Sequence, residues 1–172
     1  MRIEYRAIAR VVKTHGRKGE VVTVPVHGLP SLMRKGLEVA VVPPPLKGPR
    51  VRSVASADDG DRGQLVRLAG VDGIDAASSL VGKTLLARVG DLPEGFEYHD
   101  ADWLMGRSVV DEKIGPLGRI EEVMVGPAND VWSIMGPFGE VMLPVVEEFV
   151  LGTDEDGAIH VSAPDGLVEA EG

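Results

Sequence analysis

Residues Glu20–His27 read EVVTVPVH, and the fold can be predicted outward from this stretch. Apolar and polar side chains alternate along it with period two, as they do in a strand that buries one face. Pro25 lacks a backbone N–H, so it predicts the edge or the end of that strand. Short β-rich runs of the same kind lie on both sides: Ala7–Val12, Leu37–Val42, Val51–Ala57, Gln64–Ala69 and Lys83–Val89.

One segment of the first half has a helical period instead. Asp72–Val81 (DGIDAASSLV) can be capped by Asp72 or Asp75. Its apolar side chains share one helical face: Ile74, Ala77, Leu80 and Val81. Six strands and one short helix within residues 1–90 predict a small six-stranded β-barrel.

Residues 91–103 interrupt the pattern with acids, Pro and Gly, and they are predicted to be a linker. Strand-like runs resume beyond it, separated by Gly, Pro or Asn-Asp turns: Ser108–Asp111, Gly118–Val125, Val131–Met135, Glu140–Leu143 and Ala158–Ser162. Val145–Val150 fits either a strand or a helical turn. Residues 104–168 are therefore predicted to be a second small barrel, and residues 169–172 a frayed tail. The predicted fold class is mainly β: two small antiparallel β-barrels, a short acidic linker and one or two short helices.

The charge changes sign near the predicted linker. Residues 1–92 carry 15 Lys and Arg against 9 Asp and Glu, whereas residues 93–172 carry 3 against 18. The net charge of −9 thus combines a half of +6 with a half of −15. A basic surface favours phosphate backbones and an acidic one favours basic proteins, which suggests a factor that acts between nucleic acid and cationic protein.

Composition excludes several classes of function. The chain has no Cys, so disulfides, thiolate catalysis and Cys-based zinc sites are ruled out. No G-x-S-x-G occurs, and the adjacent acids Asp111–Glu112 and Glu121–Glu122 point to opposite faces of their strands. We expect no enzyme and no cofactor. The N-terminus is too short and charged for a secretory segment, and no apolar run spans a bilayer, so we expect a cytoplasmic protein without membrane contact.

The basic half contains two groups of candidate RNA-facing residues. His15, Arg17 and Lys18 lie in a turn that also needs positive φ at Gly16 and Gly19, so a purely structural turn is an equal alternative. The other candidates are Arg34, Lys35, Arg50 and Arg52. Arg50 and Arg52 share one face of a strand, which suits phosphate contact but also an ordinary solvated surface.

The acidic half contains most of the aromatic residues. Exposed Tyr and Trp beside acids can hold a cationic partner, and this interpretation is favoured for Tyr98 and Trp103. Core packing is favoured for Trp132 and Phe149, which lie in apolar runs. His99, Asp100 and Asp102 contain the donor types of a hard-cation site, although an acidic linker produces the same letters, and we expect no metal.

Several motifs in order resemble the RimM family of bacterial ribosome maturation factors over nearly the whole chain. The matching segments are Ile8–Val21 (IARVVKTHGRKGEV), Gly70–Leu85, Gly115–Val123, Pro127–Asp130 with Trp132, Gly139–Val150, Gly157–Val161 and Pro164–Leu167. Each piece alone is weakly specific, but the series in this order is specific.

The resemblance implies a translation-factor-like N-terminal barrel and a C-terminal PRC barrel. It also implies binding to the free small ribosomal subunit through small-subunit ribosomal protein nineteen and promotion of maturation and processing of ribosomal RNA in the subunit head. We expect a monomer. Asn129 and Asp130 fall in a matching segment and join the partner-binding candidates Tyr98, His99, Asp100, Asp102 and Trp103.

The chain departs from the family at one place. A tyrosine pair common in the family falls here on His99–Asp100, so the resemblance carries over the region and not the individual tyrosine contacts. Two alternatives remain: a flavin-linked reductase, because flavin enzymes share the first barrel type, and a PRC-barrel adaptor without an RNA role.

Overall fold

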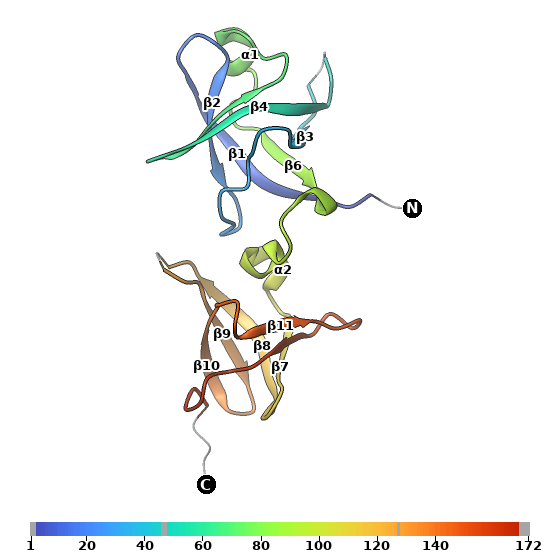
Figure 1. The fold of residues 1–172 in the computed structure, drawn as a ribbon, viewed down its shortest axis with the longest axis vertical. Coiled ribbons are helices and arrows are strands. Elements are labelled where there is room, and N and C mark those ends of the chain that lie inside the picture. Colours follow the sequence, from blue (N-terminus) through green and yellow to red (C-terminus); the bar gives the residue numbers. More distant parts are fainter. Residues whose placement is uncertain (1–2, 46–47, 127, 169–172) are drawn as a thin grey trace. The chain divides into compact units, whose positions relative to one another are not determined.

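The structure, a computed structural model, describes residues 3–45, 48–126 and 128–168 (Figure 1). The predicted frayed tail, residues 169–172, lies outside the described residues. The chain divides into two compact units, Met1–Phe96 and Glu97–Gly172. The architecture is mainly β, as the sequence predicts; the first unit has the predicted six strands, and the second has six where the sequence indicates five and one ambiguous segment. Among the described residues, no helix is long and apolar enough to cross a membrane.

The first unit is a closed barrel with strand order β1-β2-β5-β4-β3-β6. Its elements are β1 (Tyr5–His15), β2 (Glu20–Pro25), β3 (Glu38–Val42), β4 (Val51–Gly60), β5 (Gly63–Leu68), α1 (Ile74–Ser78), β6 (Thr84–Arg88) and a 3₁₀ turn (Val89–Asp91). Alternate side chains point inward because the strand period is two. Val11, Val21 and Val66 are all completely buried, and they represent the aliphatic core of this barrel.

The glycine-rich turn between β1 and β2 has the conformation that its sequence predicts. Gly16 and Gly19 have φ of +67° and +98°. A Cβ atom at Gly19 would overlap the carbonyl oxygen of Val71, so only glycine lets the turn pack against the segment before α1. This contact seats the turn beside α1, which packs against β1 and β2 (Figure 1).

The helix in this region is shorter than predicted. α1 starts after Gly73, and no side chain caps it; the Asp72 carboxylate instead pairs with Arg67. Ala77 is buried, but Ile74 is 48% exposed. The predicted caps and the full apolar face are therefore wrong, because the ion pair with a barrel strand engages Asp72 and one short turn can bury only its barrel side.

The second unit has the strand order β10-β9-β8-β7-β12-β11. Its elements are a 3₁₀ turn (Phe96–His99), α2 (Ala101–Leu104), β7 (Ser108–Asp111), β8 (Gly115–Met124), β9 (Val131–Gly136), β10 (Gly139–Pro144), β11 (Val150–Thr153) and β12 (Ile159–Val161). β7 and β12 pair in parallel, which departs from the predicted antiparallel pattern. Alternation within a strand does not encode the direction of a partner far away in the sequence.

The Asp111 side chain stabilises this parallel pairing of β7 with β12. Its buried carboxylate accepts hydrogen bonds from the backbone N–H groups of Lys113 and Ile114 at 2.9 Å and from that of Ala163 at 2.7 Å. Desolvation alone would raise the pKa of Asp111, but the three N–H donors outweigh it and hold the pKa below its usual value. One side chain thereby joins the end of β7 to the chain that follows β12.

The boundary between the units falls inside the predicted linker. Leu92 and Phe96 belong to the core of the first unit, whereas Tyr98 and Trp103 pack against the core of the second. Residues 91–103 thus contribute side chains to both cores. Acidic composition suggested a solvated connection, but its few apolar residues are spaced so that each unit buries some of them.

Candidate partner-binding surfaces

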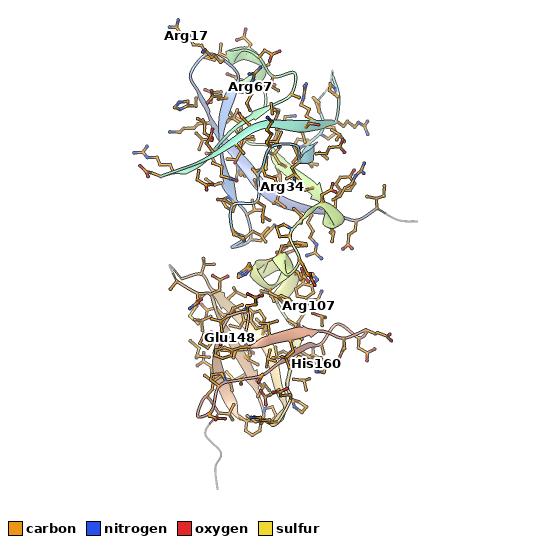
Figure 2. All side chains as sticks on the ribbon, viewed as in Figure 1. Arg17, Arg34, Arg67, Arg107, Glu148 and His160 are labelled. Atoms are coloured by element: carbon orange, nitrogen blue, oxygen red, sulfur yellow. The ribbon has the colours of Figure 1, made fainter. Side chains whose placement is uncertain are left out.

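The three basic candidates near the N-terminus share one turn. Arg17 and Lys18 lie between β1 and β2, and His15 ends β1; all three are exposed. Arg17 and Lys18 form no ion pair or hydrogen bond with the described residues. Figure 2 shows Arg17 and Arg67 toward the same end of the first unit. The glycine backbone therefore presents two unpaired cations to solvent beside α1.

The other four basic candidates divide into bound and unbound side chains. Arg52 donates to the Ala69 carbonyl oxygen at 2.8 Å, and Arg34 donates to that of Asp91 at 3.0 Å. These bonds hold irregular connections of the barrel. Lys35 and Arg50 are exposed, and neither side chain forms a hydrogen bond or ion pair with the described residues.

The seven basic candidates lie in or beside three separate connections of the barrel, β1–β2, β2–β3 and β3–β4, rather than in one patch. Arg17 and Arg34 lie toward different ends of the first unit in Figure 2. The unpaired cations are thus distributed over the barrel, which suits several separate phosphate contacts better than one deep pocket.

The predicted aromatic anchors of the second unit are partly engaged with their own fold. The Tyr98 ring meets Trp103 edge-on at 5.9 Å between centroids, and its hydroxyl lies 2.9 Å from Thr153 Oγ1. The Arg107 guanidinium lies 3.6 Å above the Trp103 ring and donates to the Trp103 carbonyl oxygen at 2.6 Å. One face of Trp103 therefore already holds a cation, which limits it as an acceptor for a cation from a partner. Trp132 is completely buried, as predicted, and Phe149 is half-buried against the core.

The polar candidates beside these rings serve two roles. Asp100 is buried and accepts from the N–H groups of Asp102 and Trp103, which caps the short helix α2. His99 Nδ1 lies 3.1 Å from Asp130 Oδ2 and links the start of the unit to the turn before β9. Within the described residues, no three His, Asp or Glu side chains gather in the manner of metal ligands.

The structure adds a feature that the sequence did not single out. An open groove of about 750 Å³ is lined by Asn129, Pro144, Val146, Glu147, Glu148 and Phe149. Glu147 and Glu148 are exposed and have no cationic partner among the described residues. Asn129 is the one sequence-predicted site residue on its wall, and Asp130 follows it directly. In Val145–Phe149 (VVEEF), apolar residues flank two acids, and this pattern indicates such a surface. The sequence did not reveal it because Val145–Val150 fits a strand and a helical turn equally well.

Each of the two units matches a domain of known proteins. Residues 7–92 match the RimM N-terminal domain, and residues 101–167 match the RimM PRC barrel domain. Proteins named ribosome maturation factor RimM from Geotalea uraniireducens and Geobacter metallireducens are 31% and 32% identical to this chain over 94% of each sequence. The protein of that name from Syntrophotalea carbinolica is 35% identical, and the alignment spans 61% of its length and 61% of this chain.

Both domain matches fall in the expected order, and the two long alignments run through nearly the whole chain. The chain therefore belongs to the RimM family of ribosome maturation factors.

Proposed function

We propose that this chain acts without catalysis in maturation of the small ribosomal subunit: it binds the free subunit through small-subunit ribosomal protein nineteen and promotes processing of ribosomal RNA in the subunit head. The relatives' name supplies the coarse role. The groove edged by Glu147 and Glu148 carries the finer proposal. Because ribosomal proteins are generally basic, an acidic groove with an apolar wall suits such a partner.

The charge distribution of the second unit supports this choice of surface. After Arg119 the chain contains neither Lys nor Arg. A cationic partner that approaches the groove therefore meets no basic side chain from that part of the sequence. Complementary charge of this kind raises association rates and selects partners.

The first barrel is proposed to approach RNA through its unpaired cations. Arg17, Lys18, Lys35 and Arg50 are exposed and free of partners within the described part of the chain. Contacts of this type neutralise phosphates without reading sequence, so the affinity for RNA should fall steeply as salt rises. A PRC-barrel adaptor without an RNA role would show no such dependence.

Depletion of the protein in its own bacterium tests the cellular role. We expect sucrose gradients to show accumulated free small subunits that contain unprocessed RNA. Re-expression of the intact chain should restore the profile, and re-expression of a variant with both Glu147→Gln and Glu148→Gln should restore it less well. A normal profile after depletion would contradict the proposal.

A further inference from the structure

β10 forms one edge of the sheet in the second unit, beside β9 (Figure 1). Its register with β9 is regular over six pairs, from Gly139 opposite Gly136 to Pro144 opposite Val131. The strands are joined by a two-residue loop, so Gly136 and Gly139 form the first hydrogen-bonded pair. Hydrogen-bonded pairs then alternate along the ladder, and the bond from Val145 N to Asp130 O at 2.7 Å continues this alternation.

The alternation determines which backbone groups of β10 point away from β9. They are the N–H and C=O groups of Glu140 and Met142. No other backbone segment of the described residues bonds to them. Glu140 and Met142 are also exposed, with Met142 at 41%, so these groups face solvent.

Natural sheets usually protect such an edge with lysine, a bulge or a very short strand. The opposite edge, β11, has four residues and a break in register between Val150 and Gly152. β10 instead has six residues, an unbroken register and no lysine, and its proline stands only at its end. β10 is therefore the better template for an added strand.

The charges around this edge specify what can be added. Glu140 lies on β10 itself, and the groove with Glu147 and Glu148 begins at Pro144, where the strand ends. Within the described residues, none of these three carboxylates forms an ion pair; Glu140 accepts a hydrogen bond from the Ser133 hydroxyl at 2.7 Å and keeps its charge. An incoming strand with basic side chains at alternate positions would place them beside Glu140, while its backbone pairs with the edge.

We propose that β10 binds an extended segment of a protein partner, rich in Lys or Arg, as an additional strand of the sheet. In the setting of the proposed function this segment belongs to the ribosomal protein, and in that respect the inference rests on that function. The backbone bonds supply affinity without regard to sequence, and the carboxylates select a basic segment.

A synthetic peptide that alternates valine and lysine tests the inference on the full chain. In the free protein, amide hydrogens of Glu140 and Met142 should exchange rapidly, whereas those of Val141 and Leu143 should be protected by β9. Saturation with the peptide should protect Glu140 and Met142 as well. Binding without this new protection, or no binding, would overturn the inference. A peptide that alternates valine and glutamate is the control and should not bind.

Met142→Pro removes the outward N–H without loss of a bond to β9, and Met142→Ala is its matched control. We expect the proline variant to bind the lysine peptide at least about tenfold more weakly and the alanine variant to bind within about twofold of the unchanged chain. Equal loss in both variants would contradict edge pairing. If the proline variant fails to fold, the exchange experiment on the unchanged chain still decides.

The same variants separate this inference from the proposed function. If small-subunit ribosomal protein nineteen binds the unchanged chain and the proline variant equally well, edge pairing is wrong for this partner and the proposed function survives. If that protein does not bind the unchanged chain but the lysine peptide protects Glu140 and Met142, the proposed function fails and the edge site stands.

Discussion

The two units bury similar aliphatic cores, but their charged side chains serve the backbone in opposite ways. In the first unit, cations donate to carbonyl groups: Arg34 to Asp91, Arg52 to Ala69 and Lys83 to Pro43. In the second, carboxylates accept from N–H groups: Asp100 at α2, Asp111 beside β12 and Asp154 in the β11–β12 turn. Arg107 is an exception, since it donates to the carbonyl groups of Trp103 and Gly157.

Part of each charge excess is therefore structural. Irregular connections leave backbone groups unpaired, and a nearby side chain of suitable charge can satisfy them. Only the remaining charges are available to partners; they include Arg17, Lys18, Lys35 and Arg50 in the first unit and Glu147 and Glu148 in the second.

Asp111→Asn should be the most disruptive change. It weakens three hydrogen bonds from backbone N–H groups to a buried carboxylate and should cost the second unit about 3 kcal/mol of unfolding free energy. Trp103 and Trp132 both lie in the second unit, so tryptophan fluorescence during denaturant unfolding reports on that unit. Glu122→Gln removes the same charge at an exposed site and is the control. Equal midpoints for the two variants would show that Asp111 has no structural role.

The second unit should also lose stability in acid. Asp111 and Asp154 have pKa values lowered from 3.8, Asp111 by its backbone donors against desolvation and Asp154 chiefly by its hydrogen bond to His160. Their contribution is complete above about pH 3.8 and is lost as pH falls through the lower folded pKa values. Fluorescence-monitored unfolding between neutral pH and strong acid measures this loss. Asp111→Asn should make the decline shallower, and an unchanged decline would assign it to other carboxylates.

Arg17 and Lys18 should contribute to RNA affinity without a role in stability. Replacing both with alanine should reduce the slope of log affinity against log salt by about 1.4 to 1.8, because two phosphate contacts are lost. Binding to small-subunit ribosomal RNA over a range of salt concentrations measures the slope. The matched control replaces Glu147 and Glu148 with glutamine and should leave the slope unchanged. If the slope is the same in all three proteins, RNA does not contact this turn.

Glu147→Gln with Glu148→Gln should have the smallest effect, on protein binding. Exposed charges contribute about 0.5 kcal/mol each, so the affinity for small-subunit ribosomal protein nineteen should fall about fivefold at low salt, mainly through slower association. Calorimetry and stopped-flow binding measure the two quantities. Glu121→Gln with Glu122→Gln is the control for general charge. A loss that persists at high salt would indicate a buried contact instead of a rim charge.

Tyr98 and Trp103 are engaged in the fold and are also candidates for partner contact. Both were expected at an interface, yet both pack against the second core, and Arg107 covers one face of Trp103. Alanine at either position would remove packing as well as any partner contact. Tyr98→Phe removes only the hydroxyl that meets Thr153, so it separates the two effects.

Local pattern predicted most of the strands and the turn at Gly16 and Gly19. Alternation placed β2, β7 and β9 within a residue or two, because burial of one face imposes that period on the sequence itself. It missed β11, whose Val150–Thr153 sequence contains a glycine and shows little alternation. It also extended α1 too far, because the pairing of Asp72 with Arg67 depends on a strand that the helix sequence does not describe.

The sequence alone determined two β units, the reversal of charge between the halves and the absence of cysteine, since these depend on composition and short-range period. Which charges are engaged depends on the tertiary fold: Arg52 and Asp111 bond to backbone groups, whereas Arg17 and Glu148 remain exposed. The same is true of the open edge of β10 and the groove at Pro144. A charge or a strand edge is available to a partner only if no segment from elsewhere in the chain contacts it. Such long-range contacts do not affect the local periodicity of the sequence, so the sequence pattern cannot predict them.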